Sequence, residues 1–127
     1  MKHRISIDGS DQYLGSLSDV EHFVIDLHLK SRGYPRLIQA IAPNGATMSI
    51  GVGRAESVLN YIAPDQHPAY TAIGSNPSSQ ETIAFSICGE ETQLSRRYAM
   101  AFEKALNGFT FFCESGNMSS EFQWEQD

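Results

Sequence analysis

The pattern of apolar and polar residues predicts an amphipathic helix in the N-terminal third of the chain. Its apolar side chains recur at helical spacing on one face: Val20, Phe23, Val24 and Leu27. Ser18 and Glu21 have the spacing of a capping box, and Gly33 is placed to end the helix. The pattern therefore predicts a helix near residues 17–32.

A second amphipathic segment, "RRYAMAFEKALNGFTFFCESG", lies near the C-terminal end of the sequence. One stripe carries its apolar side chains: Phe102, Ala105, Leu106, Phe109 and Cys113, with Tyr98 one turn earlier. This spacing predicts a helix over 97–115. Glycine costs about 1 kcal/mol in a helix interior, so Gly108 indicates close approach to another element, which we expect to be the sheet.

Between the helices, short segments alternate apolar and polar residues with period two, which is typical of half-buried strands. The strand segments are "HRISID", "PRLIQAIA", "ATMSIGVG", "SVLNYIA", "AYTAIG" and "TIAFSI". Turn signals such as Pro43-Asn44-Gly45 keep the connections short, which favours antiparallel neighbours. We therefore predict one α+β domain over residues 1–127: an antiparallel β-sheet meander with two main helices packed mainly on one face.

The C-terminal segment "EFQWEQ" also alternates, with Phe122 and Trp124 on one face and Glu121, Gln123 and Glu125 on the other. This pattern predicts a half-buried strand that completes the core with its aromatic side chains. The large apolar residues that we expect in the core are Phe23, Leu27, Phe85, Phe102, Phe109, Phe122 and Trp124.

Charge changes the picture because the net charge of −6 is unevenly distributed. Residues 1–80 contain seven acids and six Lys or Arg, whereas residues 81–127 contain eight acids and three Lys or Arg. Such a surface argues against direct nucleic-acid binding and favours a basic protein partner. No stretch reaches the ~20 apolar residues of a membrane helix, and "MKHRISIDGS" has no apolar signal region, so we expect a cytoplasmic protein.

Candidate chemistry is sparse. Cys88 and Cys113 lie in apolar segments, so we expect two reduced, buried thiols of low reactivity. "GVGRAE" departs from a dinucleotide-binding loop because Glu56 stands where a third glycine belongs. We therefore interpret it as the end of a strand at which glycine relieves close packing. The histidines have no metal-ligand spacing: His3, His22, His28 and His67. We predict a binding protein rather than an enzyme, with no catalytic residue, metal site or cofactor.

The stretch from Gly51 to Trp124 resembles immunity protein family one of bacterial polymorphic-toxin systems. Its matching segments are, in order, "GVGRAESVLNYI", "AYTAIG", "TIAFSI", "YAMAFEKALNGF" and "FQWEQ". In this resemblance Glu56 is shifted by one residue from the expected acidic position. The resemblance implies a cytoplasmic immunity protein that binds and neutralises a cognate toxin domain in a 1:1 complex. Such toxins are often nucleic-acid deaminases and sometimes nucleases.

An acidic inhibitor is attracted to the Lys and Arg with which such a toxin holds phosphate, and it then blocks the active site or substrate groove. The residues that we expect to contact the toxin are Glu56, Tyr61, Asp65, Glu90, Glu91, Glu121 and Glu125. The alternative interpretation is a small enzyme or ligand-binding domain with a cleft on a concave sheet face. Its lining would come from Gln39, Asn60, Tyr61 and Tyr70.

Overall fold

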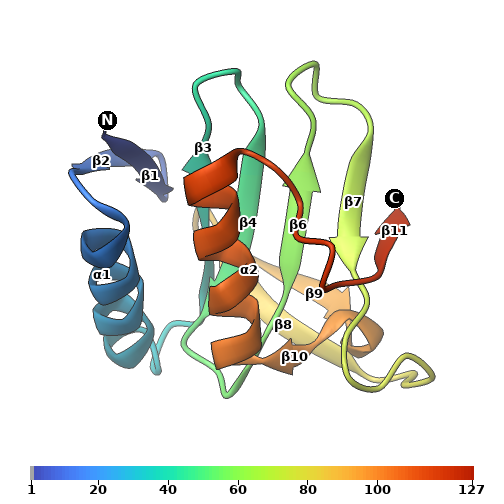
Figure 1. Ribbon diagram of the computed structural model, residues 1–127. Helices are drawn as coiled ribbons and strands as arrows, with labels where there is room; N and C mark the ends of the chain where they lie inside the picture. The colour runs from blue at the N-terminus through green and yellow to red at the C-terminus, as the bar shows by residue number, and fades with distance from the viewer. Residues whose placement is uncertain (1) are drawn as a thin grey trace.

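An antiparallel sheet forms the centre of the protein, and all its strands lie within the residues that the computed structural model describes, 2–127 (Figure 1). Along its main path the strand order is β11-β7-β6-β4-β3-β1-β2, and every neighbouring pair on this path is antiparallel. The strands of this path are β1 (His3–Ile7), β2 (Ser10–Leu14), β3 (Arg36–Ile41), β4 (Thr47–Val52), β6 (Leu59–Ile62), β7 (Ala69–Ala72) and β11 (Trp124–Gln126). The predicted α+β meander is confirmed.

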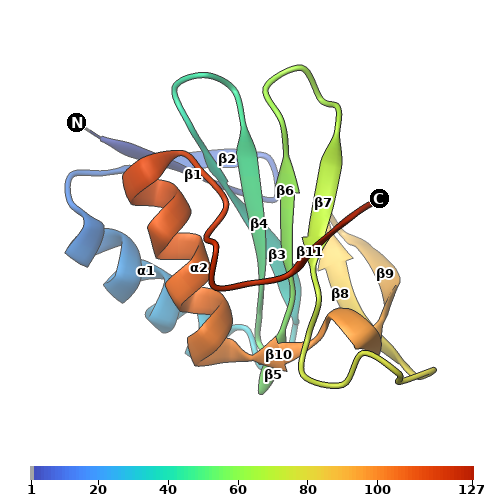
Figure 2. The ribbon, with the colours of Figure 1, turned by 45° about the vertical axis from the view of Figure 1, so that its right-hand side comes forward.

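Both helices, α1 (Leu17–Lys30) and α2 (Phe102–Ser115), cover the same face of this sheet (Figures 1 and 2). The N-cap of α1 is Ser16, whose Oγ accepts the backbone N–H of Asp19 at 3.0 Å, so the predicted capping role of Ser18 is wrong. Within residues 2–127 neither helix has the length and apolar character needed to span a membrane.

The second helix begins five residues later than its periodicity predicts. Arg96–Tyr98 form a 3-10 turn, η1, and Met100–Ala101 form a short strand, β10. β10 pairs with β5 (Glu56–Ser57), and the carbonyl of Ala99 accepts the N–H of Ser75 at 2.9 Å. Pairing with distant backbone therefore overrides the helical pattern of this segment.

A hairpin of β8 (Thr82–Ile87) and β9 (Glu90–Ser95) lies on the sheet side opposite the helices (Figure 2). A single parallel bridge to β3 attaches it, and the N–H of Ser86 donates to Pro35 O at 2.8 Å. The Phe85 ring covers Gly51, where an added Cβ would lie 2.6 Å from ring carbons. The glycine of "GVG" thus relieves packing at a strand end, as the sequence indicates.

The main core lies between the helices and the sheet. Of the predicted core residues, Phe102, Phe109 and Phe122 are buried there. Phe85 is also buried, as predicted, but between the hairpin and Gly51 on the opposite sheet face. Phe23, Leu27 and Trp124 are only half-buried, at the edge of the main core.

The C-terminal tail crosses the helix-bearing side of the sheet and then adds β11 beside β7 (Figure 1). The side chain of Phe122 approaches α2 at Gly108, where an added Cβ would lie 2.7 Å from its ring. Trp124 packs edge-on against Phe122 with ring centroids 5.9 Å apart, and its Nε1 donates to Ser119 O at 2.9 Å. The tail is therefore part of the fold, although its strand covers only Trp124–Gln126.

Candidate functional site

The sheet face turned away from the helices carries a row of polar side chains that crosses every strand of the main path. Residues directly opposite one another on antiparallel strands share a face, so the strand register defines this row. From β2 to β11 it consists of Asp11, Ser6, Gln39, Ser49, Asn60, Thr71 and Glu125. We call this surface the open face.

Hydrogen bonds connect neighbours along the open face. Gln39 Nε2 donates to Ser49 Oγ at 3.3 Å, and Asn60 Nδ2 donates to Thr71 Oγ1 at 3.2 Å. Asp127 extends the row, because its carboxylate accepts from Asn60 Nδ2 at 3.1 Å and from the Thr71 hydroxyl at 2.7 Å. These bonds hold the short side chains of the row in fixed positions.

A second row on the same face is mainly apolar. The strand register and the backbone bond from Asp127 N to Ala69 O place in it Tyr13, Arg4, Ile41, Thr47, Ile62, Ala69 and Asp127. Tyr13 is 59% exposed at the β2 edge. The β8–β9 hairpin lies on this same side of the sheet and covers the Gly51 end of the face (Figure 2). Glu90 stands on the side of the hairpin that carries Phe85. The middle of the open face thus combines apolar and uncharged polar side chains, and the charged side chains stand near the ends of the two rows.

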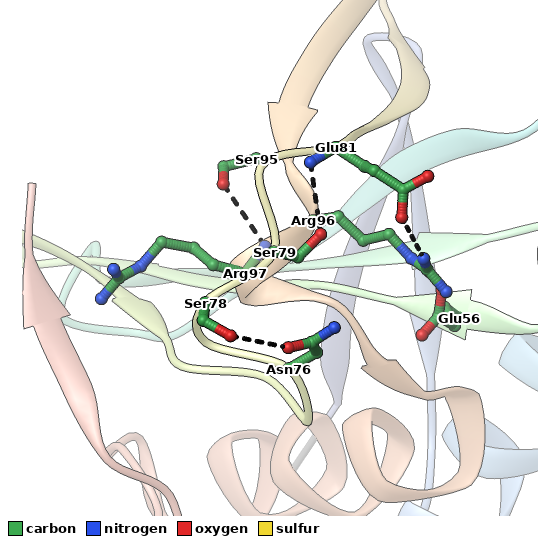
Figure 3. Close-up of polar contacts among 8 residues, drawn as sticks. All are labelled: Glu56, Asn76, Ser78, Ser79, Glu81, Ser95, Arg96 and Arg97. Carbon is green, nitrogen blue, oxygen red and sulfur yellow. Dashed lines mark hydrogen bonds and ion pairs between the residues drawn. The ribbon is translucent and has the colours of Figure 1, made fainter.

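Glu56 does not present a free carboxylate to a partner. The guanidinium of Arg96 lies between two carboxylates, with Nε 2.9 Å from Glu56 and a second nitrogen 2.8 Å from Glu81 (Figure 3). Hydrogen bonds to Glu56 and then to Glu81 raise the pKa of Arg96 above its ordinary value. Glu56 therefore fixes η1 to β5, a structural role that the sequence did not reveal.

Glu125 is also engaged within the fold. One carboxylate oxygen pairs with Arg97, and the other accepts the Tyr98 hydroxyl at 2.6 Å. This hydrogen bond is the main cause of the raised pKa of Tyr98, because losing the phenolic proton breaks it. Glu125 lies on the face of β11 opposite Trp124, as the alternation predicts, and its carboxylate ties η1 to β11.

The other predicted contact acids are exposed and have no ion-pair partner among residues 2–127, but they lie on separate elements. Asp65 is in the β6–β7 turn, Glu90 and Glu91 open β9, and Glu121 is in the tail on the helix side. Tyr61 is half-buried on the helix-bearing face, edge-on to Phe112 at 6.0 Å. The fold therefore does not bring the predicted set into one patch.

The lining expected for the alternative function is also divided. Gln39 and Asn60 share the open face, whereas Tyr61 pairs directly with Tyr70 on the face covered by the helices. The two tyrosine rings are 6.5 Å apart. These four side chains therefore do not line one cleft.

Over the whole surface, acids still outnumber cations once ion pairs are removed. Within residues 2–127, six of the 15 carboxylates pair with five of the nine Lys and Arg. Nine carboxylates and four cations remain without such a partner. The unpaired carboxylates are Asp19, Glu21, Asp65, Glu90, Glu91, Glu103, Glu114, Glu121 and Asp127. This residual charge is available for long-range attraction of a basic protein.

The "GVG" segment also meets α1, in a contact that the sequence did not reveal. Gly53 N–H donates to His28 Nδ1 at 2.9 Å, and the His28 ring stacks on Phe102 with centroids 3.6 Å apart. Gly53 has φ of +102°, and an added Cβ would lie 2.3 Å from Ser31 O. Burial, and secondarily Arg32, lower the pKa of His28, while Glu103 opposes this. His28 is therefore a structural acceptor.

The two thiols differ from each other. Cys113 is half-buried, and burial raises its pKa to about 12, so it stays protonated. Cys88 is exposed at the β8–β9 turn, which corrects the prediction of a buried thiol: the turn places it at φ of +48°, away from both cores. Among residues 2–127, no three His, Cys, Asp or Glu side chains are grouped as metal ligands.

A scan of the chain against models of known protein families finds no match, and a comparison with curated protein sequences finds none either.

Proposed function

We propose that this chain is an immunity protein that binds a basic bacterial toxin domain and neutralises it by steric occlusion. The observation that carries the proposal is the surface charge: nine carboxylates and four cations lack an ion-pair partner among residues 2–127. The resemblance of Gly51–Trp124 to immunity protein family one gives this charge a purpose. A toxin that acts on nucleic acid holds phosphates with Lys and Arg, which attract an acidic protein.

In this proposal the protein has no reaction of its own and needs no cofactor. It forms a 1:1 complex in the cytoplasm with a nucleic-acid deaminase or, alternatively, a nuclease, and it does not contact nucleic acid directly. Occupying the toxin's substrate groove excludes the phosphate backbone, so inhibition requires contact area and residence time rather than catalysis.

The acids divide into two roles. Glu90, Glu91, Glu121 and Asp65 are exposed and have no cation partner among residues 2–127, so we assign them to long-range steering of the toxin domain. Glu56 and Glu125 are assigned to the fold, because Arg96 and Arg97 already neutralise them. A substitution at either position is therefore expected to affect stability before it affects recognition.

The test is co-expression with the C-terminal domain encoded by the gene directly upstream of this one. We expect the two chains to co-purify at 1:1 and the domain's activity on single- and double-stranded DNA and on RNA to fall in proportion to added protein. In the matched control, this chain is unchanged and is co-expressed with an unrelated basic protein of similar size in place of the toxin domain. Failure of the upstream domain to co-purify, with the folded chain present in excess, contradicts the proposal.

A further inference from the structure

The open face differs from an ordinary solvent-facing sheet surface in its central side chains. Its five middle positions are all short or uncharged: Ser6, Gln39, Ser49, Asn60 and Thr71. Solvent-facing strands commonly carry Lys or Glu, which also discourage association. Side chains of Ser, Thr and Asn lose little rotamer entropy when a partner covers them. Ser49 at its centre is already buried and its four neighbours in the row are half-buried, so a partner that covers the middle of this face orders little that is not already ordered.

The border of the open face has the opposite character. Two carboxylates without an ion-pair partner among residues 2–127, those of Glu90 and Asp127, stand on it, beside the ion pairs Asp11–Arg4 and Glu125–Arg97 that belong to the fold. The border is net acidic, whereas the middle is uncharged and flanked by Ile41, Ile62 and Ala69. An uncharged, partly apolar centre within a charged rim is the usual anatomy of a protein–protein interface.

The middle row also has unused acceptors. Asn60 Nδ2 is engaged by Tyr70 O, Thr71 and Asp127, which leaves its carbonyl oxygen without a donor among residues 2–127. Gln39 similarly uses Nε2 on Ser49 and leaves its Oε1 without a donor among those residues. Two fixed carbonyl oxygens within an acidic border match a partner that presents N–H donors, and Arg presents five of them.

We propose that the open face, centred on Ser6, Gln39 and Asn60, is the surface on which the toxin domain docks, with its Arg and Lys side chains meeting the carbonyl oxygens and the acidic border. This inference rests on the proposed function and specifies the face that carries it. Seven strands at the usual spacing span roughly 30 Å, which suits a standard interface of about 800 Å² per partner.

The experiment compares three charge-matched variants: Ser6→Arg and Gln39→Arg on the open face, and Asn107→Arg on the exposed side of α2. The probe is the C-terminal domain encoded directly upstream, titrated into each folded variant by calorimetry. Each open-face variant should weaken binding at least about tenfold, because it places bulk and positive charge at the centre of the contact. Asn107→Arg should bind within about threefold of wild type. Melting temperatures identify any variant that fails to fold, and the other open-face variant then carries the test.

The outcomes separate the two proposals. If wild-type protein does not bind the domain, the proposed function and the docking face are both overturned. If wild type binds, and both open-face variants bind like wild type, the function stands and the open face is overturned. If Asn107→Arg loses binding while both open-face variants still bind the domain, the open face is also overturned, and the contact lies on the helices.

Discussion

Replacing Gly108 with Ala tests how closely α2, the sheet and the C-terminal tail are packed. In an isolated helix this change is stabilising by about 1 kcal/mol, because glycine is a poor helix former. In the folded protein the added Cβ would lie 2.6 Å from Leu59 Cδ1 and 2.7 Å from a ring carbon of Phe122. Both neighbours are buried, so neither can move away without displacing others.

Overpacking of a dense core costs about 1–3 kcal/mol, and two contacts below 3.0 Å place Gly108→Ala near the upper end. Subtracting the helix-propensity gain leaves a net loss of about 1–2 kcal/mol in the free energy of unfolding. For a domain of this size that corresponds to a melting temperature lower by about 3–8 °C.

The assay is urea unfolding followed by circular dichroism, with Asn107→Ala as the matched control. Asn107 is exposed on the same helix, so its replacement should only add helix propensity and stabilise by about 0.5 kcal/mol. The double variant Gly108→Ala/Phe122→Leu should lose less than the sum of its parts, because the smaller side chain relieves the overlap. If Gly108→Ala is as stable as wild type or more stable, the close approach of tail and helix is refuted.

Three further changes test other parts of the account. Phe122→Ala should lower the free energy of unfolding by about 3–4 kcal/mol, because it empties a buried site under α2; a loss below about 1 kcal/mol in urea unfolding would mean that the tail is dispensable. Glu125→Gln should cost only about 0.5–1 kcal/mol, since the pair with Arg97 is partly exposed, and should leave toxin affinity unchanged; a tenfold loss of affinity by calorimetry would return Glu125 to the interface. In the folded protein the pKa of His28 lies below its ordinary value of 6.5. As the pH falls through 6.5, the unfolded chain therefore takes up a proton at His28 before the folded chain does. The stability that neutral His28 contributes above pH 6.5 is then progressively lost. Stability measured from about pH 7.5 to about pH 5.5 should therefore decline more steeply in wild type than in His28→Gln, and equal slopes would contradict this role.

The sequence predicts which residues share a face better than it predicts where elements begin. The alternation of "ATMSIGVG" correctly groups Met48, Ile50 and Val52 on one face, which lies beneath the helices. Alternate side chains of a strand point to opposite faces of the sheet, so the buried face selects every second residue. Gly108 likewise indicates close packing from the sequence alone, because a glycine in a helix interior lowers helix stability and therefore points to a close neighbour.

Elements defined by distant partners were not predictable from local pattern. β2 pairs with the adjacent β1 and is missed for another reason: all but one of its residues are exposed, so it shows no apolar alternation. The start of α2 was misplaced because Met100 pairs with Ser57, 43 positions earlier in the chain. The ion pairs of Glu56 and Glu125 are hidden for the same reason: a carboxylate that meets an Arg 40 or 28 residues away cannot be distinguished from a free one in the sequence.

The rate of association with the upstream-encoded toxin domain, measured against ionic strength, tests the central claim most directly. The chain is compared with a Glu90→Gln/Glu91→Gln/Glu121→Gln variant, which removes three unpaired carboxylates and leaves the ion pairs of the fold intact. We predict that the wild-type rate falls about tenfold or more from low to physiological salt, and that the variant associates more slowly with little change in its dissociation rate. A wild-type rate that is flat over this range, and equal to that of the variant, would contradict electrostatic recognition of a basic toxin.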